Sequence, residues 1–451
     1  MTEQQYQAWL ADLTVERILL AELEHAEGVE YVATAPYISR PTDSVPNRPY
    51  DDILNQAVDI STRIDGLISF GDVSLLDDGR LESWLGRAWT GHPIRLYLGG
   101  PEWSLDDFRL LARGRNGGVT EARRGSLTFA MEDESRILDE VIDTGELPDD
   151  AGPVPLVLGS VYNAPMPRVE TTSVTYRASY LALTGVTPKD NGNPVSYTAD
   201  LAAGRVTLDA TPVGEVTADL EEAHNTPPLI AQWVAGQYGI AVAEIGLPAY
   251  RVGLYYSGEV TGRQVLDDLC AGLGAYWYLN ALGELVVRQH QAPTGPADLT
   301  LVSDEIVYDQ LTLAETQAPW KSLRLRWGQN HSPLNQLAGT VAANQPEEAA
   351  RLKRDWNDSH ATQAVGDYPL AESAERDSCI QDAADAATER DRLLAIRSVR
   401  RDVWEIEAFL PPVSVGDVIA IEHPRLAGRL GREIGVTRSP TRGVSTLEVW
   451  V

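Results

Sequence analysis

Short runs in which apolar and polar residues alternate recur along nearly the whole chain, and most are bounded by Gly, Pro, Asn or Asp. In 205–208 and 216–220 the apolar side chains fall at every second position, so each run has one apolar face when extended. No repeat of about 20–50 residues is visible, which argues against a solenoid or a propeller. The pattern predicts a multi-domain, β-rich α+β protein with several small β-barrels or sandwiches, one helix–hairpin module and one long helix.

The chain has 451 residues, and a domain with one hydrophobic core usually has about 100–200 residues. The chain is therefore expected to fold into several domains. The stretch TGELPDDAGPVP, 144–155, is typical of a linker. We therefore predict four segments: an N-terminal β-rich domain (1–148), a β linker domain (149–222), a helix–hairpin α+β domain (223–312), and a long helix with a C-terminal β domain (313–451).

Local signals place elements within these segments. A helix is expected over 4–12, an antiparallel hairpin from 17–23 and 29–33, and a further helical stretch over 84–89. The sequence Thr211-Pro212-Val213-Gly214 is expected to be the turn between the runs 205–208 and 216–220. Helices begin at Thr226-Pro227 and at Thr261, and a hairpin over 275–288 follows the second. The long helix is expected over about 370–397, before a strand in which Trp404, Ile406, Ala408 and Leu410 share one face.

The net charge restricts which kinds of partner the protein is expected to bind. The chain has 37 basic and 66 acidic residues, a net charge of -29. Such a surface argues against coating nucleic acid or binding anionic membranes, both of which need basic patches, but it does not exclude a channel that repels DNA. No apolar run reaches the about 18 residues of a membrane-spanning helix, and the first residues lack the pattern of a secretory signal.

Nucleophile and general-base candidates are few. Cys270 and Cys379 are too few for a disulfide scaffold or a four-cysteine metal site, and both are expected to be reduced and buried. Ser160 lies in Leu158-Gly159-Ser160-Val161, which lacks the second glycine of a nucleophile elbow. None of the seven histidines lies in a zinc-protease motif, and His25 and His423, each beside a carboxylate, are expected to be ordinary surface residues. We predict no catalytic residue.

The sequence gives equally little evidence for a phosphate, metal or sugar site. Gly114-Arg115-Asn116-Gly117-Gly118 follows no buried parallel strand and opens no helix, so we expect a hairpin turn instead of a phosphate loop. Asp72, Asp77, Asp78 and Gly79 resemble a fragment of a calcium loop without its closing glutamate, and a solvated turn is expected. A carboxylate pair for glycoside hydrolysis stays open. The eleven tryptophans are expected mainly to be core or interface anchors. We predict no cofactor and no metal.

Several stretches together resemble the baseplate or tail-tip hub proteins of long-tailed (siphovirus-like) bacteriophages. The N-terminal and middle stretches are Ala8-Trp9-Leu10, 17–23, 66–78, 80–89, 94–108 (IRLYLGGPEWSLDDF), 153–163 (PVPLVLGSVYN) and 201–217. The C-terminal ones are Gly274-Ala275-Tyr276-Trp277, Leu282-Gly283-Glu284-Leu285, Val415-Gly416-Asp417-Val418-Ile419 and the closing strand with Trp450. Their order covers most of the chain.

The resemblance implies a structural hub without catalytic residues, located in the virion tail tip and assembled in the bacterial cytoplasm. It implies a homotrimeric ring that joins the tail tube to tip or fibre proteins and forms part of the DNA passage. Its expected neighbours are distal tail, tape-measure and tip or fibre proteins, with DNA only in transit and no stable membrane insertion. The resemblance also allows the first and last segments to lie together, because hub folds are often interleaved. Some related tip proteins hold an iron–sulfur cluster through several cysteines, and two cysteines do not suffice for one.

Two other functions stay open from the sequence. One is a receptor- or sugar-binding tail-tip module, which would sit at the periphery of the particle. The other is a tail-associated cell-wall hydrolase, which would need a cleft with a perturbed carboxylate pair.

Overall fold

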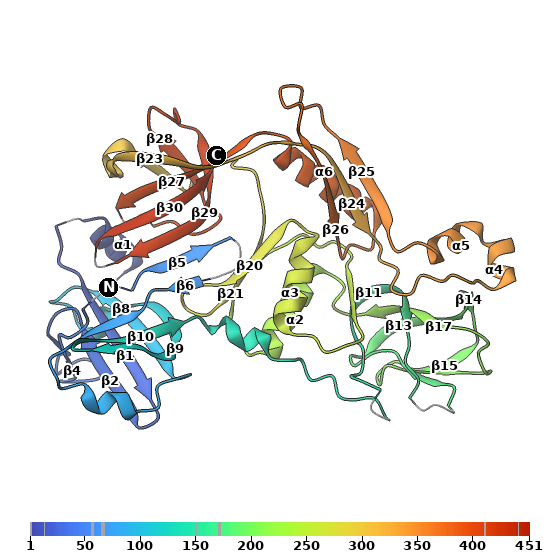
Figure 1. Ribbon diagram of the computed structural model, residues 1–451, viewed down its shortest axis with the longest axis horizontal. Helices are drawn as coiled ribbons and strands as arrows, with labels where there is room; N and C mark the ends of the chain where they lie inside the picture. The colour runs from blue at the N-terminus through green and yellow to red at the C-terminus, as the bar shows by residue number, and fades with distance from the viewer. Residues whose placement is uncertain are drawn as a thin grey trace.

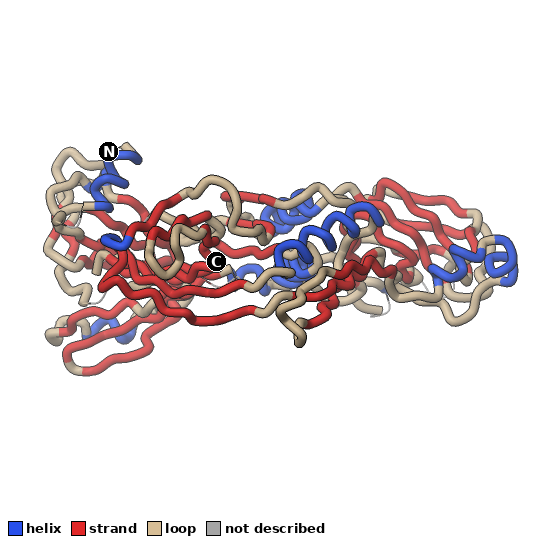
Figure 2. The backbone as a smooth tube through the Cα atoms, turned by 90° about the horizontal axis from the view of Figure 1, so that it is seen from above, coloured by secondary structure: helices blue, strands red, loops and turns tan. Residues whose placement is uncertain are grey.

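The computed structural model describes residues 2–12, 14–55, 58–64, 68–148, 151–169, 173–409, 412–440 and 442–451. Within these ranges the strands form seven sheets, so the predicted β-rich, multi-sheet fold class is confirmed. Leu410, and the predicted start of the second segment at residue 149, lie outside the described residues. The molecule is elongated, with the strands near both chain ends at one end and the sheets of the second segment at the other (Figures 1 and 2).

The first sheet is built from the N-terminal residues in the order β2-β1-β8-β9-β10-β7. Its strands are β1 (Ile18–His25), β2 (Gly28–Ala33), β7 (Val73–Asp77), β8 (Pro93–Gly99), β9 (Arg109–Arg123) and β10 (Gly125–Glu132). The predicted N-terminal helix is α1 (Glu3–Ala11), and the predicted hairpin is the antiparallel pair β1–β2. A small pair, β3 (Tyr37–Ile38) and β4 (Pro49–Tyr50), lies beside them. The first four residues of β1 are apolar and buried because the strand is covered on both faces: Leu19 and Ala21 lie in the main core, and Ile18 and Leu20 lie in a smaller cluster.

The C-terminal sheet takes in strands from both ends of the chain. Its path is β22-β28-β29-β30-β27-β23, formed by β22 (Leu299–Val302), β23 (Ile306–Gln317), β27 (Arg401–Phe409), β28 (Val418–Glu422), β29 (Leu430–Ser439) and β30 (Val444–Trp450). The hairpin of β5 (Ile60–Arg63) and β6 (Ile68–Phe70) adds to it, because β5 pairs antiparallel with β29. One hydrophobic core spans this sheet and the first, with Leu96 and Leu447 among its members. The first and last segments therefore lie together.

The second segment supplies most of the strands of two sheets, one of which also takes in a strand of the third segment. One has the order β14-β13-β17-β11-β19, from β11 (Leu156–Pro165), β13 (Leu183–Asp190), β14 (Asn193–Pro194), β17 (Val216–Glu222) and β19 (Gly253–Tyr256). The other is β12-β16-β15, from β12 (Thr175–Arg177), β15 (Tyr197–Asp200) and β16 (Arg205–Leu208). The turn 211–214 therefore does not close a hairpin: β16 and β17 belong to different sheets, because each finds its partners in strands distant in sequence.

The helix–hairpin module forms where its sequence signals lie. Helix α2 (Pro227–Gln237) starts with proline after Thr226, where no N–H donor is needed. Helix α3 (Gly262–Ala271) is capped by the Thr261 hydroxyl, which accepts from the Gln264 backbone N–H at 3.2 Å. The predicted hairpin is β20 (Ala275–Leu279) with β21 (Leu285–Gln289), and β18 (Val242–Gly246) pairs parallel with β21. The buried stripe of α3 packs between these strands and α2.

The long helix is shorter than predicted. Helix α6 covers Ala383–Arg397 and is capped by Asp382, whose carboxylate accepts from two backbone N–H groups. The preceding residues form β26 (Glu372–Asp377), which pairs parallel with β24 (Trp320–Trp327) opposite β25 (Asn357–Thr362). Alternating polar residues in β26 fit an exposed strand, and the sheet partner overrides their helix propensity. Two short helices, α4 (Gly339–Asn344) and α5 (Pro346–Leu352), lie in the loop before β25.

Two further predictions were wrong. The stretch 84–89 holds only part of a short 3-10 helix, Glu82–Gly86. Gly114, Gly117 and Gly118 lie inside the long strand β9 and not in a turn. They are needed because the partner strand β10 approaches closely: a Cβ on Gly114 would lie 2.5 Å from the Glu132 carbonyl oxygen. The register of the β9–β10 pair shifts between Ala130 and Met131, as a β-bulge does.

Candidate functional site

The histidines beside carboxylates are structural. His25 and His423 are only 7% and 6% exposed, so the prediction of surface residues was wrong. In each, the ring Nδ1 accepts a hydrogen bond from a backbone N–H two residues later, at 3.2 Å in His25 and 3.1 Å in His423. His25 also packs against the Trp89 ring, with ring centres 4.8 Å apart. Both rings therefore fix local turns.

Both cysteines are free and buried, as predicted. Burial raises the pKa of the Cys379 thiol to about 12 and raises the pKa of Cys270 as well. A thiol that stays protonated at neutral pH is a poor nucleophile. These two residues belong to the core between α3 and α6.

Ser160 and the turn at Asp77, Asp78 and Gly79 also have structural roles. The Ser160 hydroxyl lies 2.6 Å from a Glu221 carboxylate oxygen and accepts from Arg251 Nε at 2.8 Å. The carboxylate of Asp77 accepts from the Gly79 backbone N–H at 2.8 Å and so closes the turn after β7. Among the described residues, no group of three or more potential metal ligands is found.

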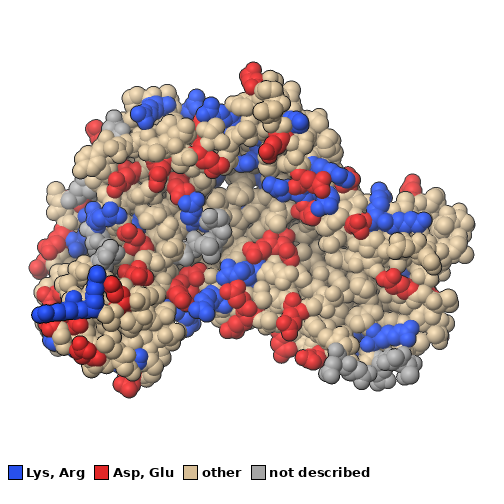
Figure 3. All heavy atoms as spheres, in the orientation of Figure 1, with Lys and Arg blue, Asp and Glu red and all other residues tan. Residues whose placement is uncertain are grey.

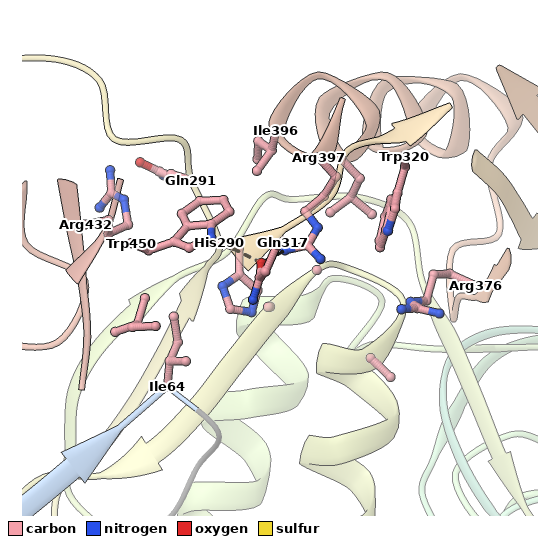
Figure 4. Close-up of a pocket in the computed structure, with 15 residues that line it drawn as sticks. Ile64, His290, Gln291, Gln317, Trp320, Arg376, Ile396, Arg397, Arg432 and Trp450 are labelled. Carbon is pink, nitrogen blue, oxygen red and sulfur yellow. Dashed lines mark hydrogen bonds between the residues drawn. The ribbon is translucent and has the colours of Figure 1, made fainter. Parts of the chain in front are cut away.

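One cavity lies between the C-terminal sheet, the helix–hairpin module and α6. Its volume is about 320 Å³. Figure 4 shows its side chains converging from several elements. Apolar walls come from Ile64, Leu393, Ile396 and Ile434; the polar and aromatic lining is His290, Gln291, Gln317, Trp320, Arg376, Arg397, Arg432 and Trp450. None of these residues is a sequence-predicted site residue.

Three of the lining residues are arginines without an acidic partner. Among the described residues, no carboxylate oxygen lies within 4.0 Å of the guanidinium nitrogens of Arg376, Arg397 or Arg432. Arg392, beside the cavity, is different: its Nη2 lies 2.6 Å from Glu389 Oε1. The cavity therefore holds three arginines that form no ion pair within the described residues.

The Trp320 ring contacts two of these arginines, Arg376 and Arg397. The guanidinium carbons of Arg397 and Arg376 lie 4.8 and 5.3 Å from the centre of the Trp320 ring, within the range of cation–π contact. Gln317 Oε1 accepts from Arg397 Nη1 at 2.6 Å and from Trp450 Nε1 at 3.3 Å. Arg397 is also in the last turn of α6, where the helix dipole favours a cation. These contacts fix the positions of the Arg376 and Arg397 side chains.

The electrostatics of the cavity follow from this arrangement. Burial, and then the charges of Arg392, Arg397 and Arg432, lower the pKa of His290 to about 4. Burial also lowers the pKa of Arg397 and Arg432, and neighbouring arginines add to the effect at Arg397. The histidine is thus neutral at pH 7, and the positive potential comes from the arginines. Chemically the cavity can accept a carboxylate or another anion.

Sequence reasoning missed this cavity because no local motif joins its residues. They come from six different strands, three loops and two helices, between Ile64 and Trp450. The one signal in the sequence is the local excess of arginine near residues 390–401. That signal alone does not distinguish a binding site from a solvated helix.

No family model matches the chain, and no curated protein matches it in sequence. Solved structures similar to it include the 43 kDa tail protein of prophage MuSo2 from Shewanella oneidensis, at 10% identity and a TM-score of 0.47, covering 96% of this chain and 98% of that one. A tail protein from Neisseria meningitidis MC58 has 10% identity and a TM-score of 0.46, with 96% of each chain covered. Prophage tail protein gp18 from Listeria monocytogenes EGD-e has 8% identity and a TM-score of 0.47, covering 96% of this chain and 94% of that one.

All three of these proteins are named as tail proteins. All three identities lie below 25% and all three TM-scores below 0.5. Within the described part of the chain, no helix has the length and apolarity needed to cross a membrane.

Proposed function

We propose that this chain is a structural, non-enzymatic hub of a phage tail tip or baseplate, and that it acts as a homotrimeric ring. The observation that carries the proposal is the insertion of β5 into the C-terminal sheet beside β29. This pairing joins the two largest sheets, one from each end of the chain, into one body with a common core. Such a body is a suitable wall segment, because it holds its shape without a central ligand.

Ring closure needs a surface on each side of the wall segment. The path of the C-terminal sheet ends at β22 and β23, whereas both end strands of the first sheet already bond in part to residues 51–55 of the same chain: the Ala33 N–H donates to the Asp51 carbonyl and the Leu76 N–H to the Ile53 carbonyl. An edge strand carries backbone donors and acceptors that a neighbouring chain can satisfy. Head-to-tail contacts of this kind between identical copies close into a ring when the rotation fits.

The charge supports a passage for DNA through that ring. The net charge is -29, and acidic side chains are spread over the face shown in Figure 3, with basic ones between them. A lumen lined with carboxylates repels the phosphate backbone, so DNA can slide without adhering. The partners in this proposal are distal tail, tape-measure and tip or fibre proteins, and the location is the virion tail tip.

Mass measurement of the purified assembly, followed by imaging of the intact tail, tests the proposal. We expect a particle of about three times 49.2 kDa and a threefold density for this chain on the tail axis. A single copy at the tail periphery that binds isolated host envelope would instead identify a receptor-binding module. Clearing of peptidoglycan in a zymogram, lost on neutralising one acidic residue, would identify a hydrolase.

A further inference from the structure

We infer that Lys189 and Asp219 form an amide cross-link within the chain, with Glu348 as the base that starts the reaction. Lys189 lies in β13, Asp219 in β17 and Glu348 in α5, and Figure 1 shows α5 beside the sheet to which the two strands belong. The inference rests on the contacts of these three residues and not on the proposed function. It adds a self-catalysed covalent modification that ties two strands of the second segment together.

The first support is the position of the lysine amine. Lys189 pairs with Thr217 in the β13–β17 ladder, so Asp219, two residues further along β17, lies on the same face of the sheet. Lys189 Nζ lies 3.0 Å from Oδ1 and 2.9 Å from Oδ2 of Asp219. Nearly equal distances to both oxygens place Nζ at about 3 Å from the carboxyl carbon, which is the separation of reacting atoms in a near-attack geometry. The Lys189 side chain is only 4% exposed, so water has little access to the amine.

The second support is a base in contact with the same amine. Glu348 Oε1 lies 3.1 Å from Lys189 Nζ and accepts from the Tyr162 hydroxyl at 2.7 Å. Burial acts to raise the pKa of Glu348, but the Tyr162 hydroxyl and the Lys189 ammonium outweigh it and hold that pKa below its ordinary value. Glu348 is therefore ionised at neutral pH and can take the proton that the lysine must lose before it attacks.

The third support is a hydrogen-bond donor on the oxygen where negative charge develops. The Asn163 backbone N–H donates to Asp219 Oδ1 at 3.0 Å. Asn163 lies at a register shift of the β11–β17 pair, with a φ of 52°, and this irregular backbone leaves its N–H free to bond the side chain. A donor fixed at this position stabilises the oxyanion that forms when the amine adds to the carboxyl carbon.

The reaction is a condensation that balances without a co-reactant. The lysine ammonium passes one proton through Glu348 to Asp219 Oδ2, and the neutral amine then adds to Cγ while Oδ1 takes the negative charge. A second proton moves from nitrogen to Oδ2, the bond between Cγ and Oδ2 breaks, and water leaves. An ammonium and a carboxylate thus become an amide and one water, and Glu348 ends as the carboxylate that it was.

The surroundings favour the product. A cavity of about 230 Å³ borders Asp219 and Tyr162 and lets the released water leave the site. Conversion of the ion pair into a neutral amide removes the desolvation cost that a buried pair of charges carries. The cross-link closes a loop that holds β14, β15 and β16, because these strands lie between Lys189 and Asp219 in the chain.

Mass spectrometry of the intact, denatured chain tests the inference. The wild type is expected to weigh about 18 Da less than its sequence, because one water is lost in the condensation. Lys189→Met and Asp219→Ala should each have the full mass of their own sequence. Glu348→Gln keeps the size of the side chain but cannot take the proton, so the cross-linked fraction should form at least about tenfold more slowly.

Lys321→Met is the matched control, because Lys321 is an exposed lysine on β24, and this variant should show the same loss of mass as the wild type. Tandem mass spectrometry of a tryptic digest is expected to show one branched peptide that joins Lys189 to Asp219. A wild-type mass equal to that of the sequence would overturn the inference. A loss of water that persists in Lys189→Met, or a branch from Lys189 to Glu348, would overturn it as well. A cross-linked chain that is monomeric in the particle would keep the inference and refute the trimeric hub.

Discussion

The hydroxyl groups of Ser61 and Thr437 lie 2.9 Å apart in a hydrogen bond across the β5–β29 pair, although 376 positions separate them in the chain. The bond belongs to a ladder in which Ser61 and Thr437 are direct partners. Ser439 adds a second side-chain contact by donating to Asp59. The N-terminal segment thus supplies a structural part of the C-terminal sheet.

Loss of the Ile60 side chain should destabilise both ends of the molecule at once. Ile60 is 2% exposed and belongs to the core that joins the two large sheets. Ile60→Ala is expected to lower the free energy of unfolding by about 2–4 kcal/mol, measured by urea denaturation, and to speed amide exchange in β29. Ile38→Ala, at a residue 66% exposed, should change it by less than about 0.5 kcal/mol. Unchanged exchange in β29 would refute the shared core.

Two glycine-to-alanine substitutions should have opposite effects. Gly159 in β11 has φ of +74°, and a Cβ there would lie 2.2 Å from the Val252 carbonyl oxygen, so Gly159→Ala should cost about 2 kcal/mol or more. Gly236 lies within α2 with no atom within 4 Å of a new Cβ, so Gly236→Ala should stabilise by about 0.5–1 kcal/mol. Thermal unfolding of both variants checks the signs, and a shift in the same direction would contradict the assignment.

Stability should fall as His290 is forced to take up a proton. Burial and the cavity arginines lower its folded pKa to about 4, below its ordinary value of about 6.5. Between these two values the unfolded state binds more protons, so stability rises with pH from about 4 to about 6.5. Comparison of the wild type with His290→Gln cancels the titration of the other groups. The wild type should show about 2–3 kcal/mol more loss between pH 6.5 and pH 4; parallel curves would show that the ring is not held neutral.

The two cysteine thiols should not react with a disulfide reagent in the native state. Cys270 and Cys379 are 4% and 6% exposed, and burial raises both thiol pKa values. Reaction with Ellman's reagent at pH 8 is expected to release no thiolate over minutes from the native protein, and two equivalents in guanidinium chloride. Rapid release of one equivalent without denaturant would place a thiol at the surface.

The buried lysine of the second segment should be replaceable only at a cost. Lys189 is 4% exposed and its ammonium lies 2.9 Å from Asp219 and 3.1 Å from Glu348. Lys189→Met keeps most of the apolar stem but leaves both carboxylates without this partner, so about 2–3 kcal/mol of stability should be lost. Lys321→Met, on β24, is the control. Equal unfolding midpoints for the two variants would show that the pair adds nothing.

Local features of the fold were predictable because their causes are local. The Thr226-Pro227 start, the Thr261 cap and the apolar stripe through Val265 and Leu269 act within a few residues, and they formed the predicted helices. The helix expected from residue 370 failed where a distant partner intervened, since β26 completes a sheet with β24. The glycines 114–118 were misassigned because a close approach of β10 is not visible in the residues themselves.

By itself, the sequence determined that the chain is β-rich and acidic, with a compact helix–hairpin in its third quarter, because alternation, caps and charge are properties of neighbouring residues. Only the tertiary structure decided that β5 joins β29, and that Arg376, Arg397 and Arg432 meet without a carboxylate. Strand pairing uses the same backbone groups in every strand, so the choice of partner depends on the whole packed core and not on any one segment.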